Sequence, residues 1–284
     1  MARARAIFLS PHLDDAVLSA GALIARRVAA GDVVEVWTFF TQGPPLETLP
    51  PERRVFGDYT TRLDEDARAL AKVGATRRLL GFVERIWREP MLARTRDVFT
   101  TPRERDFPNV PAMRAVVREA LASGADVYAP LGIGNHVDHV EVALACAEER
   151  LTSGAVAASD AAERLRFYED PYALGAACRR RHFVARRRRW NPLRGPSWAS
   201  PRVGGLLRYV AHAAHGPGLD TYAPALRDLD WRCEPAPVER FEDAKLAAIA
   251  EYGSQVAAFG GMARLSAFMR RGHALTGGEP IWRA

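Results

Sequence analysis

The sequence predicts an α/β fold, a Rossmann-like three-layer α/β/α arrangement with a mainly parallel sheet and a C-terminal insertion or lid. Over the first 150 residues or so, short runs of apolar residues with strand character alternate four times with segments in which apolar residues recur at helical spacing. Strands that alternate with helices in this way join through right-handed crossovers into a parallel sheet. Turn residues such as Pro11 and Gly74 separate the segments.

The elements can be placed in order along the chain. Residues 5–9 are an almost continuous apolar run, which is typical of a buried parallel strand. Apolar residues from Val17 to Ile24 then recur at helical spacing, so a helix follows Pro11 after a short turn. Further strands are predicted at 32–40, 77–82, 126–132 and 164–170, and further helices at 58–73, 111–122 and 140–151.

The pattern becomes less regular after the fifth predicted strand. Residues 171–240 mix Pro, Gly and aromatic residues with a run of arginines, which indicates an insertion or lid. Residues 241–259 are again helical, with acidic residues in the first turn, where the helix dipole favours them. We therefore expect a Rossmann-like core over 1–170, an insertion or lid over 171–240, and a C-terminal helix and tail over 241–284 that pack on the core.

Length and composition exclude several classes of protein. The 284 residues and 48% hydrophobic content are enough to bury an ordinary core. The apolar run near the start is too short for a signal peptide, and no stretch approaches the ~18 apolar residues of a membrane span. We therefore expect a cytoplasmic protein. The three cysteines are widely spaced and form neither a disulfide framework nor a metal-binding CxxC pair.

The net charge of +6 comes almost wholly from arginine, because Lys72 and Lys245 are the only lysines. A GC-rich genome produces this bias without a functional cause. The segment 179–194 (RRRHFVARRRRWNPLR) concentrates arginines, which suits either contact with phosphates or a solvated loop. We expect no nucleic-acid partner, and we leave open a weak contact of Arg186–Arg189 with an anionic or lipid-linked substrate.

Histidines and aspartates follow two of the predicted parallel strands. His12, Asp14 and Asp15 come directly after the first strand, and the segment 134–139 (GNHVDH) follows the fourth. The carboxyl ends of parallel strands open on the same edge of a sheet, so the two groups can converge. A catalytic zinc takes about three His or carboxylate ligands and keeps an open position for water. Two histidines and one carboxylate provide that set, which leaves the other residues for acid–base work or for orienting the ligands.

SPHLDDAVLS and GNHVDH resemble the two signature motifs of the PIG-L/LmbE-like zinc-dependent N-deacetylase family, a His-x-Asp-Asp turn and a His-x-Asp-His turn. That family removes N-acyl groups from N-acetylglucosamine-type sugars in thiol-cofactor, glycolipid-anchor and natural-product pathways. The resemblance covers residues 5 to about 150, with looser support to about 170 and near the C-terminus. Leu13 and Val137 stand where the family often has proline, and Ala16 where an acidic residue is common. These departures bear on loop rigidity and subfamily, since none of the three side chains binds metal.

The resemblance implies a role for each polar residue of the two motifs. Asp14 would be the general base that takes a proton from the attacking water. His136 would stabilise the oxyanion or protonate the leaving amine, and Asp138 would orient and charge His136. The implied zinc ligands are His12, Asp15 and His139.

Other candidate residues for substrate binding carry weaker signals. TRLDEDARAL (61–70) resembles an Arg-x-x-Glu helix of the family, which makes Arg62 a candidate to bind substrate hydroxyls or phosphate; an exposed helix arginine is the alternative. Glu84 ends a strand at the same edge and is a candidate to contact a sugar hydroxyl, with a plain salt bridge as the alternative. We expect residues 171–240 to fold over the zinc edge. Aromatic residues there that could stack on sugar rings are Tyr172, Trp190, Trp198 and Tyr209.

Three functions remain under comparison. The first is zinc-dependent hydrolysis of the N-acyl (acetyl) group of an N-acetylglucosamine-type amino sugar or its conjugate, by metal-activated water with an Asp base. The second is a metal-dependent amidase that acts on a thiol conjugate or another non-sugar amide. The third is a nucleic-acid or membrane-binding module with a vestigial metal site, which predicts scattered losses in motifs that are intact here. The sequence favours the first function, with zinc or another divalent transition metal as cofactor, and does not indicate an oligomeric state.

Overall fold

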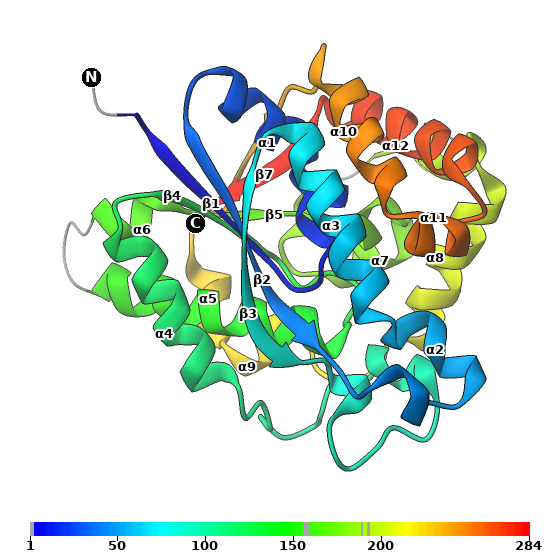
Figure 1. Cartoon of the computed structure of the whole chain (residues 1–284). Coiled ribbons are helices and arrows are strands. Elements are labelled where there is room, and N and C mark those ends of the chain that lie inside the picture. Colours follow the sequence, from blue (N-terminus) through cyan, green and yellow to red (C-terminus); the bar gives the residue numbers. More distant parts are fainter. Residues whose placement is uncertain (1–2, 156–159, 189, 192–193) are drawn as a thin grey trace.

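The structure is a computed structural model that describes residues 3–155, 160–188, 190–191 and 194–284. A seven-stranded sheet in the order β3-β2-β1-β4-β5-β7-β6 crosses the molecule, with helices on both faces (Figure 1). The first five strands are parallel, while β7 runs antiparallel to both of its neighbours. The predicted Rossmann-like α/β/α fold is therefore confirmed. The strands are β1 (Arg5–Ser10), β2 (Val33–Gln42), β3 (Thr76–Val83), β4 (Asp126–Pro130), β5 (Leu165–Tyr168), β6 (Arg232–Ala236) and β7 (Glu279–Arg283).

Strand β1 lies in the middle of the sheet and contributes to the core on both faces. Ala6 and Phe8 pack into one hydrophobic cluster, and Ile7 and Leu9 into the cluster on the opposite face, as the two-residue period of a strand requires. Helices α1, α3 and α10 cover the first face and α4 and α5 the second (Figure 1). These helices are α1 (Asp15–Ala29), α3 (Tyr59–Val73), α10 (Phe241–Glu251), α4 (Val110–Ala122) and α5 (Val137–Ala155).

The strand order reverses at the centre of the sheet. After β1 the chain moves outward on one side to β2 and β3, and it then returns to place β4 on the other side of β1. Loops that leave neighbouring strands in opposite directions open a crevice at such a switch point, where ligands of open α/β sheets bind. Both histidine-aspartate motifs follow the two strands at this point, so the topology alone brings them together.

The chain after β5 adds further helices and completes the sheet. The C-terminal tail forms β7, which lies between β5 and β6. The Glu279 carboxylate accepts hydrogen bonds from the backbone N–H groups of Ala22 and Leu23 (2.9 and 2.7 Å). These two residues follow Ala20, where α1 departs from helical geometry. Glu279 also pairs with the buried Lys245 ammonium at 2.8 Å. The three-part division at 170 and 240 stays a prediction. The remaining helices are α2 (Pro51–Gly57), α6 (Asp160–Arg164), α7 (Ala176–Arg181), α8 (Pro201–Ala213), α9 (Leu219–Tyr222), α11 (Gly253–Ala258) and α12 (Met262–Thr276).

The segment predicted to be helical over 241–259 consists of two helices, α10 and α11, because the chain leaves helical geometry at Tyr252 (φ −81°, ψ 58°). Two carboxylates of α3 stabilise the break. Glu65 accepts hydrogen bonds from the backbone and the hydroxyl of Ser254 (2.8 and 2.6 Å), and the Tyr252 hydroxyl donates to Asp66 at 3.0 Å. Partners so distant in sequence leave no mark in the local helical pattern.

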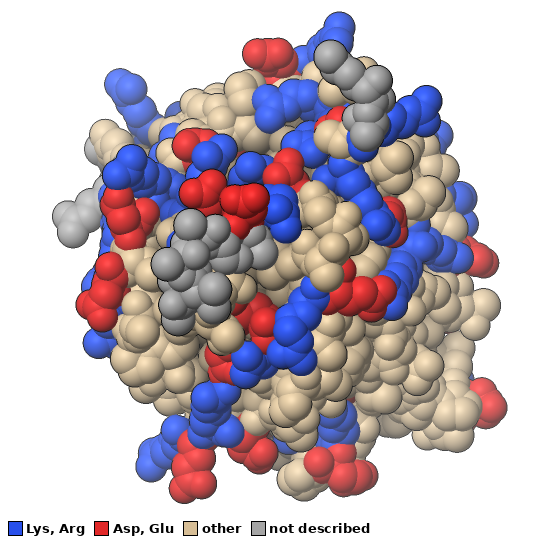
Figure 2. Space-filling view, turned by 90° about the vertical axis from the view of Figure 1, so that its left-hand side faces the viewer, with Lys and Arg blue, Asp and Glu red and all other residues tan. Residues whose placement is uncertain are grey.

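Opposite charges lie side by side on one face of the molecule. On the face shown in Figure 2, basic and acidic residues are interspersed. Between α4 and α5, for example, the guanidinium groups of Arg114 and Arg118 both lie within 3 Å of Glu149 (2.6 and 2.9 Å). Within the described part of the chain, no helix combines the length and the apolar character needed to cross a bilayer.

Candidate active site

The two motifs form one cluster at the carboxyl ends of β1 and β4. The first lies in the turn after β1, and Asp15 is the first residue of α1. In the second motif, α5 begins at Val137, so the loop predicted over 134–139 is shorter and its last residues stand in the first turn of the helix. Each helix therefore presents its N-terminal turn to the crevice. The residues brought together are His12, Asp14, Asp15, His136, Asp138 and His139.

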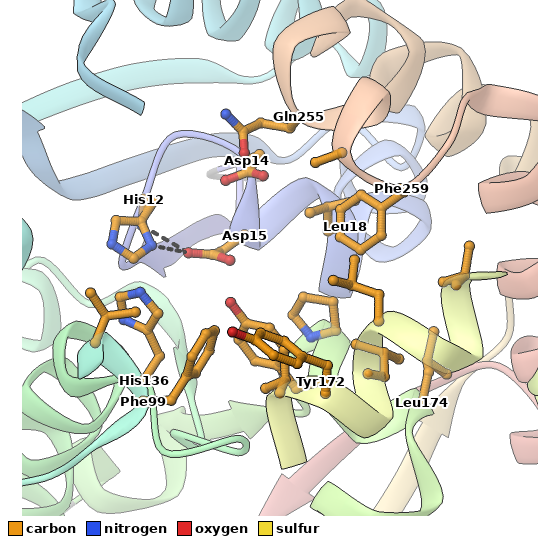
Figure 3. Close-up of a pocket in the computed structure, with 18 of the residues that line it drawn as sticks. His12, Asp14, Asp15, Leu18, Phe99, His136, Tyr172, Leu174, Gln255 and Phe259 are labelled. Atoms are coloured by element: carbon orange, nitrogen blue, oxygen red, sulfur yellow. Dashed lines mark hydrogen bonds and ion pairs between the residues drawn. The ribbon is translucent and has the colours of Figure 1, made fainter. Parts of the chain in front are cut away.

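The three predicted zinc ligands face one another. Asp15 Oδ2 lies 3.0 Å from His12 Nδ1 and 3.1 Å from His139 Nε2, and all three side chains are buried (Figure 3 shows the first two). His139 Nδ1 is 2.6 Å from the Asp170 carboxylate, to which it donates. A proton held on Nδ1 leaves the lone pair of Nε2 free for a metal, which is the usual arrangement of a histidine ligand and its carboxylate partner.

The residues present fit a metal ion. With the proton of His139 on Nδ1, the buried Nε2 faces the Asp15 carboxylate oxygen at 3.1 Å without a donor between them, and His136 Nδ1 is also buried and lacks a partner among the described residues. Both arrangements cost free energy unless a cation or a donor meets the ring nitrogen. Ligand atoms of His12, His136 and His139 lie within 4.8 Å of one another, and so do those of His12, Glu84 and Asp138. The donors are nitrogen and oxygen without thiolate, which suits zinc and related divalent metals.

Asp138 is held by several partners at once. Its carboxylate accepts hydrogen bonds from the backbone N–H of Arg85 (2.9 and 3.1 Å) and from the guanidinium of Arg88 (2.8 Å). It also lies 3.3 Å from His12 Nε2, whereas His136 Nδ1 is 3.9 Å away. The carboxylate is therefore closer to the predicted ligand His12 than to His136, and its predicted action on His136 stays a prediction.

Asp14 lies at the N-terminus of α1 and borders the cavity beside the cluster. Burial, followed by the negative charge of Asp15, raises the pKa of Asp14 to about 6. A carboxylate with a pKa near the working pH is well matched to accept a proton and to release it again. The environment of Asp14 is therefore compatible with the base role implied by the resemblance.

Arg62 of α3 and Glu84, which follows β3, also border the cavity. Their side chains form a buried ion pair at 2.8 Å, and the Tyr59 hydroxyl donates to the same Glu84 oxygen at 2.6 Å. Arg62 is thus not an exposed helix arginine. Glu84 is both in a salt bridge and next to the cluster, with Oε2 at 3.9 Å from His12 Nε2. A substrate contact by either residue stays a prediction.

A cavity of about 380 Å³ extends from this cluster. Of the aromatic residues considered for sugar stacking, Tyr172 and Tyr209 border it. Trp190 instead lies under the guanidinium of Arg179, with 4.3 Å from Cζ to the ring centroid, and Trp198 is 66% exposed.

Sequence reasoning missed two residues that hold the cluster. Asp170 orients His139, and Arg88 joins Asp138 to the buried Glu141 carboxylate, which it meets at 2.9 Å. Asp170 had a usable signal, because it follows β5 at the same sheet edge as the motifs. Arg88 had none, since it lies in a long polar segment without periodicity.

Arg186, Arg187 and Arg188, which were considered for an anionic contact, do not line this cavity. Arg187 and Arg188 donate to the backbone carbonyls of Arg227 and Thr276, and Arg186 is exposed. Arg189 lies outside the described residues. A contact of this run with an anionic or lipid-linked substrate stays a prediction.

Comparison with known proteins agrees with the geometry. Residues 7–148, half of the chain, match the PIG-L family, described as GlcNAc-PI de-N-acetylase. The 1D-myo-inositol 2-acetamido-2-deoxy-alpha-D-glucopyranoside deacetylase of Mycolicibacterium vanbaalenii is 33% identical over 178 residues, which are 56% of this chain and 56% of that relative. The match therefore spans little more than half the length of this curated relative.

Two solved structures share the fold over nearly the whole chain. The A40926 pseudoaglycone deacetylase Dbv21 is 21% identical with a TM-score of 0.59, covering 99% of this chain and 97% of its own. The zinc inhibited form of teicoplanin deacetylase Orf2 is 21% identical with a TM-score of 0.61, covering 98% and 97%. The matched segment contains both motifs and the two strands that place them, and the chain belongs to the PIG-L family of de-N-acetylases.

Proposed function

We propose that this protein is a zinc-dependent hydrolase that removes the N-acyl group from an N-acetylglucosamine-type amino sugar or its conjugate. The observation that carries the proposal is the cluster at the ends of β1 and β4, where Asp15 Oδ2 lies 3.0 Å from His12 Nδ1 and 3.1 Å from His139 Nε2 beside a cavity. Family membership supports amide hydrolysis as the reaction class, and the name of the curated relative supports an acetamido sugar as the substrate class.

His12, Asp15 and His139 would hold the metal. When bound, zinc supplies a Lewis acid that polarises the acyl carbonyl and lowers the pKa of water. Asp14 takes the proton of the attacking water and returns it toward the leaving nitrogen. His136 donates a hydrogen bond to the oxyanion as the carbonyl carbon becomes tetrahedral.

Groups farther along the cavity wall would position the substrate. The ion pair between Arg62 and Glu84 presents a donor and an acceptor side by side, which suits neighbouring hydroxyls of a sugar ring. Asp170 and Asp138 hold the rings of His139 and His12, so that the reacting groups keep their geometry without substrate.

The test is the release of primary amine by the purified, zinc-loaded protein from a panel of amides. The panel contains N-acetylglucosamine, its α-linked inositol glycoside, an N-acetylated thiol conjugate and a simple N-alkyl acetamide. We expect amine release from the sugars, with kcat/KM at least tenfold higher than for the other two. A preference for the thiol conjugate would replace the proposal by the amidase alternative, and no amine release from any amide would refute both.

A further inference from the structure

The cavity beside the cluster has two ends of opposite character. One end carries the histidines and carboxylates of the motifs, together with Arg62 and Gln255. From there the cavity continues past Tyr172 toward Leu18 and Phe259, as the close-up in Figure 3 shows. We call this second part the apolar arm. Its wall is formed by Leu18, Leu174, Val203, Leu207, Leu265 and Phe268.

The residues of the apolar arm lie outside the strands of the sheet. Val203 and Leu207 come from α8, and Leu265 and Phe268 from α12. All four side chains are at most 3% exposed, so this part of the cavity wall belongs to the buried core. Leu18 connects it to the cluster, because it lies on α1 one turn after Asp14.

The six side chains that form the wall of the apolar arm are all apolar, and Tyr209 of α8, which also borders the cavity, is 48% exposed. Gln255 is drawn beside Asp14 in Figure 3, and Thr95 and Arg96 are exposed residues of the wall. A sugar ring in the arm would lose the hydration of its hydroxyls without gaining hydrogen bonds, which costs about 1–3 kcal/mol for each group. A methylene chain would gain free energy from the same surroundings.

Resting on the proposed function, we propose that the apolar arm binds the acyl chain of the substrate, and that the preferred substrate is an amino sugar whose N-acyl chain is longer than acetyl. With the amide at the cluster, the sugar lies at the polar end near Arg62 and Glu84, and the chain extends past Tyr172 into the arm. Hydrolysis breaks the C–N bond of the amide: the hydroxyl of water goes to the acyl carbon and its remaining proton to the nitrogen, which releases the amino sugar and a medium-chain carboxylic acid.

The experiment measures kcat/KM for glucosamine amides of acetic, butanoic, hexanoic and octanoic acid. Each added methylene is worth ~0.8 kcal/mol of burial, so kcat/KM should rise about fourfold per methylene until the arm is full. Val203→Phe and, independently, Leu174→Phe place a ring in the arm, and each should lower the octanoyl-to-acetyl ratio at least tenfold. Arg208→Ala, at an exposed position of the same helix, should leave the ratio unchanged. Thermal unfolding verifies that each variant is folded.

A second readout does not depend on turnover. Calorimetric titration of the zinc-loaded protein should show octanoate binding at least tenfold tighter than acetate, and both narrowing variants should remove this difference. Equal kcat/KM across the series, or equal binding of octanoate and acetate, would overturn the inference while leaving the proposed function intact. Absence of hydrolysis of every amide, with octanoate still bound more tightly, would refute the proposed function instead.

Discussion

The motif edge, residues 10–15 and 134–139, and the apolar arm border the same cavity, yet the chain encodes them in different ways. The histidines and aspartates of the motif edge follow one of two adjacent parallel strands, within five residues of the end of β1 and within nine residues of the end of β4. The arm is assembled from residues on α1, α8 and α12, which are separated by about 180 and 50 residues of chain, and from Leu174 in the segment after β5.

This difference decides how each region responds to change. The position of the motif edge depends on the sheet and on buried charge pairs. Single substitutions of its polar residues should therefore have large, specific effects on zinc affinity or on kcat. The arm consists of ordinary apolar side chains, and substitutions there should change which substrate is preferred. The following predictions probe the motif edge and, last among the substitutions, helix α3, which carries Arg62.

The largest effect is expected at Asp14. Asp14→Asn keeps the shape of the side chain but removes the base, so kcat should fall by roughly 10²–10⁴ while zinc content stays near one per chain. Asp64→Asn, an exposed substitution on α3, is the control and should change neither quantity. Loss of zinc from Asp14→Asn, with zinc retained by Asp15→Asn, would show that the roles of the two aspartates are reversed.

Arg88→Ala tests whether the motif edge depends on residues outside the motifs. The substitution leaves the fully buried carboxylates of Asp138 and Glu141 without their shared guanidinium, and the free energy of unfolding should fall by about 3 kcal/mol in urea titrations. Arg68→Ala breaks the surface pair with Glu251 and should cost at most ~1 kcal/mol. An equal decrease in the free energy of unfolding of the two variants would mean that the contacts of Arg88 with Asp138 and Glu141 do not stabilise the motif edge.

Asp170→Asn should weaken zinc binding by roughly 10–100-fold, because the amide no longer offers His139 Nδ1 a charged acceptor. Competition with a chelator of known affinity measures the change. Asp220→Asn, on the short helix α9, serves as the matched control. An unchanged zinc affinity in Asp170→Asn would remove His139 from the ligand set or show that its ring needs no carboxylate.

The smallest effect is expected at Asp66, where α3 meets the chain break at Tyr252. Burial is the main cause that raises the pKa of Asp66 to about 7. The folded protein therefore keeps this proton between about pH 4 and 7 while the unfolded chain releases it, so stability falls as pH rises through this window. Asp66→Asn stays neutral and can still accept from Tyr252. Its free energy of unfolding relative to wild type should increase by about 2 kcal/mol between pH 5 and pH 8, and a constant difference would contradict the assigned protonation.

The comparison also shows what could be predicted from the sequence. Apolar runs between segments of helical spacing predicted the strands from β1 to β5. The ends of two of these strands indicated where both motifs lie. Both features are local in the sequence. Local patterns could not predict β7, whose place beside β5 depends on long-range pairing, or the helix break at Tyr252, which Glu65 and Asp66 stabilise from another helix.

The same limit applies to the candidate site. His12 and His136 could be predicted as site residues because each is a histidine that follows a predicted strand. The structure places them in one cluster, and their roles stay predictions. Arg88 is one arginine among many, and its partners Asp138 and Glu141 lie about 50 residues away. In the sequence, Val203 and Leu207 have the pattern of ordinary buried residues of a helix. They line a cavity because α12 and α1 contribute the other residues of its wall, which local sequence does not indicate.

The most direct test of the proposed ligand set is the zinc content of three proteins: wild type, His139→Ala and His136→Ala, each stripped with a chelator, reloaded with zinc and dialysed. We expect about one zinc per chain in wild type and in His136→Ala, and almost none in His139→Ala, with circular dichroism unchanged in all three. Zinc retained by His139→Ala but lost from His136→Ala would contradict the ligand set, and wild-type protein that binds no zinc after reloading would contradict the metal-dependent function itself.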